Sequence, residues 1–451
     1  MPTVPTGRAR RDVELSLIDI GLVLFFFFLP HDLESDGLVR FTALSDLLTH
    51  GRVWDMSYSF VGPLCSTPLY LIGTIVLAPE WWCARFNTVV FAGGLFAMYR
   101  LLRDDVDRGL LRKLCLVLIA ASMFPFHVRE YFGEVFTAVL VAVGAIALQV
   151  ERPLTGWTAI VVGVVNMPAS LAGLALVAVK QAWDTRRWRH LLPIAIAAAL
   201  IMLESWIRRG GPFVTGYQGN SGARTVMPYS GLPGFSYPLF FGLLAILFSY
   251  GKGLLFFAPG LLLPVTRRTT GVTSGPVASE VGLRATYSLW ICFLAGLIVV
   301  YAKWWAWYGG WFWGPRFFLF ASIPASLAIA VWLHEARTAS QPARVAALMA
   351  LTLSAWVGVS GAVFGQNDLQ GCLENSFALE HICWYVPEFS VLWHPFVTGL
   401  RLSGDQIVIA VYLLVVYVWL AVPLVAEIVR TATPRVAASL RARRDFGAWR
   451  F

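Results

Sequence analysis

The chain has 451 residues, of which 58% are hydrophobic and only 14% are charged, and its formal net charge is +9. A soluble domain of this length needs far more charge to cover its surface, so the composition excludes an ordinary soluble enzyme or binding module. The positive balance has two readings, nucleic-acid binding or membrane orientation, and the positions of the basic residues decide between them.

Apolar runs of about 17–25 residues recur along the whole chain, and each is long enough to cross a hydrocarbon core of about 30 Å. A basic stretch precedes the first run, and no small-residue cleavage site follows it, which indicates an uncleaved first span. We expect an all-α polytopic membrane protein, a bundle of about twelve transmembrane helices. They are placed near 14–30, 84–102, 112–126, 133–150, 155–167, 169–183, 190–206, 254–266, 283–302, 316–333, 345–364 and 406–427.

The charge distribution orients these spans. With the amino terminus inside, twelve spans place both termini in the cytoplasm, and 24 of the 35 lysines and arginines then fall in cytoplasmic segments. This bias fits a multi-pass protein of the bacterial plasma (inner) membrane and explains the net charge without nucleic acid. We expect two regions, 1–150 with the outer loop 31–83, and 151–451 with outer segments 207–253, 303–316 and 365–405.

Cysteines in the outer segments bear on the compartment. Cys372 and Cys383 are 11 residues apart in the last outer segment, where an oxidising exterior makes a disulfide plausible. A Cys65–Cys83 bond is less favoured. The sequence contains no CxxC or HExxH motif and no metal-binding cluster with a recognisable spacing.

An acidic stretch follows the first apolar run directly, with acids at positions 32, 34 and 36. After Asp36 the apolar residues Leu38, Phe41 and Leu44 fall on one helical face, which predicts an amphipathic helix lying along the outer leaflet. Asp36 would stand at the amino-terminal end of this helix, with Arg40 one turn away. The simpler interpretation is that Glu34 and Asp36 favour a helix amino terminus and face water.

The stretch "FPFHVREYFGEVF" (124–136) places more polar groups on the same side. Glu134 opens a span, where a carboxylate costs on the order of 2–3 kcal/mol unless it has a partner. His127, Arg129 and Glu130 stand beside it. Arg129 and Glu130 are equally consistent with an ordinary interfacial ion pair.

The stretches "FSYGKGLLFFAPG" (248–260) and "WWAWYGGWFWGPRFF" (304–318) each bring a cation, Lys252 and Arg316, to the outer interface. A phosphate at the membrane surface needs such partners, and arginine offers a two-pronged donor. Tyr308 and Trp313 would contact a substrate there, or belong to an interfacial aromatic belt. Glycines would let the backbone approach a ligand closely, at positions 251, 253, 309, 310 and 314.

The order of an acid, "GLVRFTALSDLLTHG", a Gly/Pro stretch, "PLYLIG" and "ARFNT" resembles the amino-terminal region of the GT-C superfamily of integral-membrane glycosyltransferases. The aminoarabinose and protein O-mannosyl transferase branch is the most similar. The resemblance covers the first 150 residues and, in pattern, 235–335. Where aminoarabinose transferases carry an acid and a lysine, "CSTPLY" offers Cys65, Ser66 and Thr67, so the sugar and the acceptor do not carry over.

The resemblance implies an inverting glycosyltransferase that uses a polyprenyl-phosphate sugar. Asp36 matches the family's catalytic base, and Glu134 matches the acid that opens the fourth span. Arg316 and Lys252 would bind the donor phosphate. The other residues expected to contact substrates are Glu34, Arg40, His127, Arg129, Glu130, Tyr308 and Trp313.

The remaining expectations concern ligands. The acceptor would be an envelope glycan, a lipid or a protein on the extracytoplasmic face, and membrane lipids would surround the protein. A composition rich in Ala, Arg and Trp is compatible with a high-GC bacterium, for which a mannose- or arabinose-like sugar would be natural. The superfamily includes both metal-dependent and metal-independent members, so the resemblance is compatible with a divalent cation (Mg or Mn) and identifies no certain cofactor.

Two other classes of function stay open. A transporter or flippase of lipid-linked saccharides also places charges near spans, but the sequence shows no matching pair of broken helices in its two halves. An inactive relative could serve only as a scaffold. If the activity of the protein requires Asp36 and is not coupled to ion movement, the transferase is favoured over the transporter and over the inactive scaffold.

Overall fold

The structure is a computed structural model that describes residues 7–265, 280–365, 369–398 and 402–447. These residues are predominantly helical and contain no β-strand, only an isolated bridge between Asp32 and Glu130. The expected all-α architecture is confirmed.

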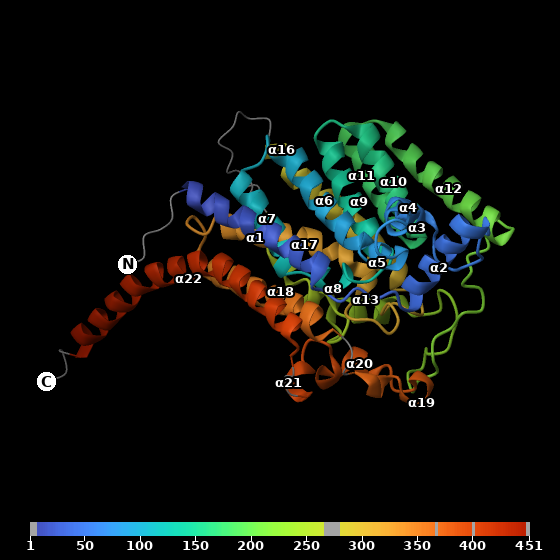
Figure 1. Ribbon diagram of the computed structural model, residues 1–451. Helices are drawn as coiled ribbons and strands as arrows, with labels where there is room; N and C mark the ends of the chain where they lie inside the picture. Colours follow the sequence, from blue (N-terminus) through green and yellow to red (C-terminus); the bar gives the residue numbers. More distant parts are fainter. Residues whose placement is uncertain (1–6, 266–279, 366–368, 399–401, 448–451) are drawn as a thin grey trace.

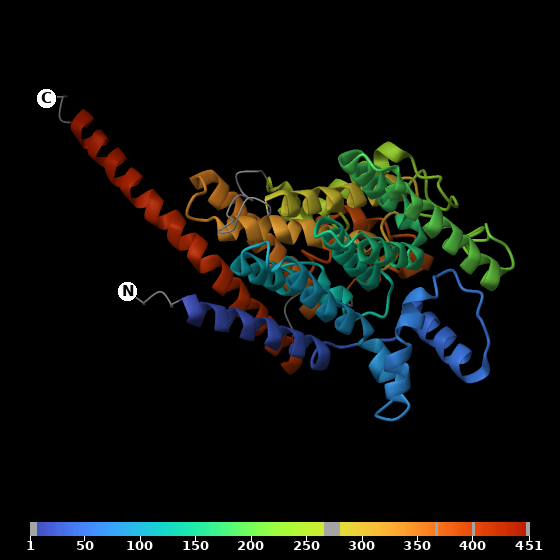
Figure 2. The same ribbon diagram turned by 90° about the horizontal axis from the view of Figure 1, so that it is seen from above.

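The long helices form one elongated bundle, in which both termini lie at one end while α2 and the carboxyl end of α12 lie at the other (Figures 1 and 2). α22 continues well beyond the rest of the bundle. The bundle helices are α1 (Gly7–Phe27), α6 (Phe86–Leu102), α7 (Arg108–Ala120), α9 (Glu134–Gln149), α10 (Pro153–Asn166), α11 (Leu171–Thr185), α12 (Leu192–Arg209), α13 (Leu239–Phe248), α16 (Glu280–Tyr301), α17 (Ser322–His334), α18 (Gln341–Val359) and α22 (Gly404–Gly447).

The centre of the bundle is α9, which is apolar on almost every face and buried along most of its length. It packs closely on α10, where Gly144 and Gly156 face each other. A Cβ on Gly144 would stand 2.7 Å from the Gly156 carbonyl oxygen, so small residues are what allow the two backbones to approach. This tight pair fixes the amino-terminal end of α9, and with it Glu134.

Five helical segments among the described residues are long and apolar enough to cross a membrane: Trp188–Arg209, Gly282–Tyr301, Arg316–His334, Gln341–Phe364 and Gly404–Ala432. Four more are apolar but only 10–17 residues long: Phe86–Leu102, Glu134–Gln149, Pro153–Asn166 and Leu239–Phe248. The multi-pass class is supported, but twelve full-length spans are not confirmed, because a straight crossing needs about 20 residues.

Two chain breaks decide how the expected spans map onto the structure. The break expected at "NMPAS" is present, because α10 ends at Asn166 and α11 begins at Leu171. The span expected over 254–266 is wrong for its described part. The chain forms only α14 (Leu254–Phe257) and the 3₁₀ helix η3 (Pro259–Leu262) there, since Pro259 disfavours helical geometry at Ala258, whose φ is −138°.

The segment 31–83, expected to be the first outer loop, contains four helices, α2 (Ser35–His50), α3 (Val61–Cys65), α4 (Thr67–Gly73) and α5 (Pro79–Ala84). The amphipathic helix expected after the first span is α2, and it ends at Gly51 with a φ of +67°. Its Phe41 and Leu44 are buried in a small second core with Tyr70 and Tyr131. The apolar face of α2 therefore packs on protein, and this packing fixes the position of Asp36 in its first turn.

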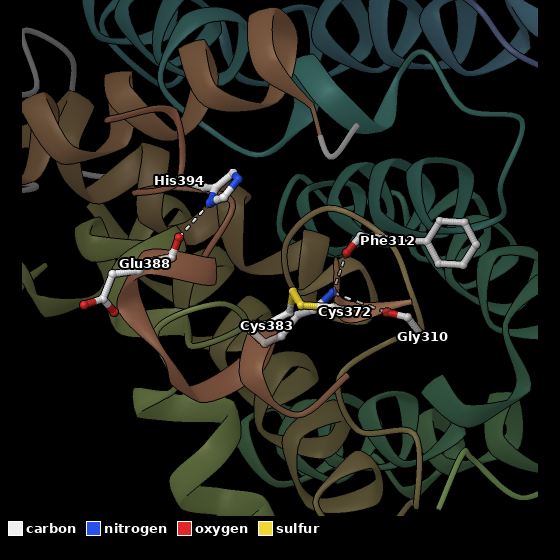
Figure 3. The surroundings of a disulfide bond; sticks show 7 residues. Gly310, Phe312, Cys372, Cys383, Glu388 and His394 are labelled. Carbon is white, nitrogen blue, oxygen red and sulfur yellow. Dashed lines mark hydrogen bonds between the residues drawn. A yellow bond between two sulfur atoms is a disulfide. The ribbon is translucent and has the colours of Figure 1, made fainter. Parts of the chain in front are cut away.

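The described part of 365–405, expected to be the last outer segment, carries short helices, α19 (Glu374–Phe377), α20 (Ile382–Tyr385) and α21 (Pro395–Thr398), along one side of the bundle (Figure 1). Cys372 and Cys383 form the expected disulfide (Figure 3). The Gly251 N–H donates to the Trp384 carbonyl oxygen at 3.0 Å, which ties this segment to the 248–254 turn.

Candidate active site

Asp36 and Arg316, 280 positions apart in the chain, meet in a direct ion pair. Arg316 Nη1 donates to Asp36 Oδ2 at 2.8 Å, and the two side chains are 9% and 12% exposed respectively. Asp36 comes from the first turn of α2, and Arg316 begins the 3₁₀ helix η4 (Arg316–Ala321), which leads into α17. The convergence expected from the sequence is present.

Glu134 is the third member of this centre. It is the first residue of α9, and its Oε1 lies 3.6 Å from Arg316 Nε. The guanidinium therefore sits between two carboxylates, which gives Glu134 the partner that a carboxylate at the entrance of a span requires.

Aromatic rings surround the Arg316 guanidinium, with Phe312 at 4.0 Å, Phe317 at 5.1 Å and Phe132 at 5.3 Å from the guanidinium carbon to the ring centroids. Within the described residues its Nε finds no hydrogen-bond acceptor, and its one hydrogen bond goes to Asp36. Arginine has five N–H donors. Arg316 is thus held in place with most of its donors unused.

A small pocket lies between α9, α16 and η4 next to this centre. Its charged lining residues are Glu134 and Arg316. The rest of the lining is largely apolar: Thr137, Ala138, Met167, Phe293, Leu297, Phe317, Leu319 and Phe320. Such a lining suits a molecule with an anionic group beside an apolar chain.

Tyr58 holds the second carboxylate oxygen, since its hydroxyl donates a short hydrogen bond to Asp36 Oδ1. Burial alone would raise the pKa of Asp36, but the Arg316 charge, the Tyr58 hydrogen bond and the nearby Arg40 hold that pKa below its ordinary value. Asp36 is therefore a carboxylate at neutral pH. Burial, followed by the charge of Asp36, raises the pKa of Tyr58, so the hydroxyl keeps its proton.

Sequence reasoning missed Tyr58, because nothing in its local sequence marks it. An indirect signal was available in Arg208 and Arg209, two arginines at the carboxyl end of an apolar helix, which the sequence-based orientation predicts to face outward, where basic residues should be scarce. Both donate to the backbone around Tyr58.

The structure places three of the expected substrate residues near this centre without direct contact to Asp36. Arg40 donates to the Ser59 carbonyl oxygen at 3.3 Å and lies over the Tyr58 ring at 4.9 Å. Arg129 forms the ion pair expected as the simpler interpretation, 3.9 Å from Glu130, and also lies 3.4 Å from Asp32. Burial raises the pKa of Glu130 to about 7.

Glu34 is exposed at the residue before α2, and its side chain makes no capping hydrogen bond with that helix. Its backbone carbonyl accepts the Gly37 N–H at 2.9 Å, as the first turn of the helix requires. The carboxylate therefore faces outward, as the simpler interpretation of the acidic stretch predicted.

Trp313 and Tyr308 are packing residues here, which corrects the expected substrate contacts. Trp313 is fully buried, stacks on Phe126 at 5.1 Å and donates to Ser360 Oγ at 3.3 Å. Tyr308 is 4% exposed, stacks on Trp384 at 3.9 Å and donates to Glu380 Oε2 at 3.1 Å. Neither ring is free to face a ligand.

His127 is buried against the Trp313 ring, and its Nε2 finds no partner among the described residues. Burial, then the charges of Arg316 and Lys252, lowers its pKa to about 3. The imidazole is neutral at physiological pH, so it provides no charge for a phosphate.

Lys252 does not reach the Asp36–Arg316 pair. Its ammonium donates to the carbonyl oxygens of Gly310 (3.3 Å), Phe312 and Gly314 (3.0 Å). Because an ammonium has three donors, this geometry leaves none for a ligand. The expected phosphate contact is not supported, and Lys252 instead holds the turn that positions Phe312 and Arg316.

The glycines of this turn serve its own backbone. Gly309, Gly310 and Gly314 have φ values of +81°, +74° and +62°, a region that favours glycine. A Cβ on Gly309 would stand 2.9 Å from Arg316 Cγ. The close approach is to Arg316 itself rather than to a ligand.

For the metal question, no group of three or more His, Cys, Asp or Glu side chains lies close enough together to hold an ion in the described part of the chain. The centre instead sets Arg316 between Asp36 and Glu134. A bound Mg or Mn stays a sequence-based prediction.

Comparison with known proteins defines the class of fold. No family model and no curated protein matches this sequence. A solved structure nevertheless has a similar fold, of the kind that the motif resemblance implied. The similarity is to the crystal structure of ArnT from Cupriavidus metallidurans bound to undecaprenyl phosphate, with a TM-score of 0.51, 14% identity, and coverage of 92% of this chain and 77% of that one.

Proposed function

We propose that this protein is an inverting glycosyltransferase that takes a sugar from a polyprenyl-phosphate donor at the Asp36–Arg316–Glu134 centre. The observation that carries the proposal is the Asp36–Arg316 ion pair beside a pocket with largely apolar walls. The similar fold of ArnT, solved with undecaprenyl phosphate, supports the class of donor.

The donor phosphate would bind Arg316, whose unused N–H groups suit two phosphate oxygens. The polyprenyl chain would follow the apolar pocket lining, including Phe293, Leu297 and Phe320. As the bond between the anomeric carbon and the phosphate oxygen breaks, negative charge grows on the phosphate, and Arg316 stabilises it. Glu134 holds the guanidinium from its other side.

Asp36 would act as the general base. An acceptor hydroxyl attacks the anomeric carbon from the face opposite the phosphate, its proton goes to an Asp36 oxygen, and the bonding electron pair leaves with the lipid phosphate. The phosphate competes with Asp36 for Arg316. Because the Arg316 charge lowers the pKa of Asp36, donor binding would raise that pKa and make Asp36 a stronger base.

The proposal keeps the expected cellular setting: a bacterial plasma membrane, cytoplasmic termini, about twelve crossings and an extracytoplasmic site. The sugar would be mannose- or arabinose-like, and the acceptor an envelope glycan, lipid or protein. The two expected regions share the centre, because Asp36 and Glu134 belong to 1–150 while Arg316 belongs to 151–451.

The test is incubation of the purified protein with a panel of polyprenyl-phosphate sugars, measuring which donor is consumed and how much free polyprenyl phosphate is released. Consumption that requires Asp36 is expected. Consumption unaffected by Asp36→Asn would contradict the assignment of the base. Movement of an intact lipid-linked saccharide across vesicles, without release of the lipid phosphate, would indicate the flippase instead.

A further inference from the structure

Residues 54–60, named the strap here, connect α2 to α3 without helical structure. The backbone carbonyl groups of such a segment need partners from elsewhere in the molecule. The strap passes beside the first turn of α2 and carries Tyr58, the hydrogen-bond donor to Asp36.

Arg208, near the carboxyl end of α12, supplies these partners from one guanidinium. It donates to the carbonyl oxygens of Trp54 at 3.3 Å, Met56 at 2.9 Å and Tyr58 at 2.7 Å. Arg209 adds a second donor to the Met56 carbonyl at 2.6 Å. Alternate carbonyl groups of the strap are thus held along one edge.

Glu204, one turn earlier on α12, completes the arrangement. Its Oε1 accepts Arg208 Nη1 at 2.8 Å and the Phe60 N–H at 2.7 Å. The Arg208 side chain is only 3% exposed and that of Glu204 is 16% exposed. One buried ion pair therefore holds both the middle and the end of the strap.

From this network we propose that Tyr58 is a positioning residue for Asp36, and that the Glu204–Arg208 pair keeps it in position by holding the strap. The role of Asp36 in transfer rests on the proposed function, but the contacts do not. The strap fixes the Tyr58 backbone, and the Arg40 guanidinium, 4.9 Å from the centroid of the Tyr58 ring, favours the rotamer that directs the hydroxyl at Asp36.

The surroundings of Asp36 single out Tyr58 among the groups that influence it. The charged groups are Arg316, Arg40 and Glu134, contributed by η4, α2 and α9. Burial, then the Asp36 charge, also raises the pKa of Tyr217, from the 210–237 loop. Two neutral side chains donate to Asp36 Oδ1: the adjacent Ser35 hydroxyl, at 3.4 Å, and the Tyr58 hydroxyl, which makes the shorter contact and comes from outside α2.

The first experiment needs no turnover. Carbodiimide labels protonated carboxyl groups, so labelling of Asp36 over a series of acidic pH values, read by mass spectrometry, gives a midpoint. Tyr58→Phe removes a hydrogen bond that favours the carboxylate, so its midpoint should move to higher pH. The pH midpoint of Asp36 labelling is compared, rather than the amount of label. A change in the exposure of Asp36 would alter the amount of label but not the midpoint.

The second experiment tests the strap. Arg208→Lys replaces the planar fork with a single ammonium, and amide hydrogen exchange in the 53–61 peptide should become faster. The Asp36 midpoint should move in the same direction as in Tyr58→Phe, and the double variant should move it no further. Glu204→Gln, a milder change, serves if Arg208→Lys fails to fold.

Tyr70→Phe is the matched control. The Tyr70 hydroxyl is 3.0 Å from Ser45 Oγ, so it also hydrogen-bonds to α2, but away from Asp36. The Tyr70→Phe variant should therefore have the same midpoint of Asp36 labelling as the wild type. An unchanged midpoint in Tyr58→Phe, or faster strap exchange without any change in midpoint, overturns the proposal.

If a donor is found, the acid limb of the kcat/KM pH profile should shift to higher pH in Tyr58→Phe. Its kcat should fall by less than the roughly hundredfold expected when a base is removed. If the wild-type protein consumes no donor, the proposed function fails while the labelling midpoint still decides the positioning role. If sugar transfer requires Asp36 but Tyr58→Phe does not change the labelling midpoint, the positioning role is wrong while the proposed function stands.

Discussion

Two buried arginines, Arg208 under the strap and Arg316 in the centre, use their guanidinium groups in opposite ways. Arg208 donates to three backbone carbonyl oxygens and pairs with Glu204. Arg316 makes one hydrogen bond, to Asp36, within the described residues and is otherwise surrounded by aromatic rings and the pocket.

The difference teaches how to separate a structural cation from one that can bind a ligand. A guanidinium whose donors are satisfied by backbone oxygens is committed to the fold, because each lost hydrogen bond would leave a buried oxygen unpaired. A guanidinium that lies between rings and two carboxylates but makes one hydrogen bond keeps donors for an incoming anion. Burial alone does not distinguish them, since both are buried.

Asp36→Asn tests the centre with the largest expected effect. Turnover should fall by at least about a hundredfold, because a positioned base is removed. The protein should still fold, since Glu134 remains beside Arg316. The measurement is donor consumption, with Asp46→Asn as the control from a half-buried position on the same helix, where the carboxylate bonds Trp54 and His50 rather than Arg316. Equal losses of turnover in Asp36→Asn and Asp46→Asn would contradict a special role for the Asp36–Arg316 centre.

Arg316→Lys and Arg208→Lys, made in parallel, test the contrast directly. Arg316→Lys should reduce kcat/KM for the donor by about 10–100-fold, the range that corresponds to a hydrogen bond between charged groups. Arg208→Lys should instead lower the free energy of unfolding by on the order of 1–3 kcal/mol. Donor kinetics and thermal unfolding in detergent separate the two, and the reverse pattern would reject the distinction.

Lys252→Met tests whether Lys252, like Arg208, stabilises the fold rather than binding a ligand. Its removal leaves buried carbonyl oxygens of the 310–314 turn without donors, so unfolding should become easier by about 2 kcal/mol. Thermal unfolding in detergent measures this, and the exposed Lys303→Met on the preceding segment is the control. A large rise in the KM for the donor without a change in stability would instead support the sequence-based prediction that Lys252 binds the donor phosphate.

Glu130→Gln should give the smallest effect. Burial raises the folded-state pKa of Glu130 from 4.5 to about 7, so the proton binds the folded protein more tightly. That contribution is fully present below pH 4.5 and disappears as the pH rises through about 7. Thermal midpoints of the variant should therefore vary less over pH 4.5–7 than those of the wild type, whereas the exposed Glu388→Gln should follow the wild type.

The sequence predicted the parts of the centre that sit at helix ends. Asp36 follows the first apolar run and Glu134 opens another helix, so both could be placed from hydrophobic periodicity and motif order. Arg316, in a Gly-Pro-Arg turn before an apolar run, was located in the same way. Their meeting depends on how α2, α9 and η4 pack, which the fold of the bundle supplies.

The sequence could not predict which polar groups are already satisfied. Lys252 and Trp313 have the right chemistry for a binding site, but three carbonyls and Ser360 take up their donors. Tyr58 escaped notice for the converse reason. Its position is set by α12, about 150 residues further along the chain.

The Cys372–Cys383 disulfide has a consequence for when the protein matures. The two cysteines are 11 residues apart, and Trp384, directly after the second, stacks on Tyr308, in the turn that leads to Arg316. Disulfides form in oxidising compartments, so a newly translated chain would insert its helices first and form this disulfide only after oxidant reaches it. Recombinant production under reducing conditions should therefore yield inserted protein in which this aromatic contact is incompletely formed.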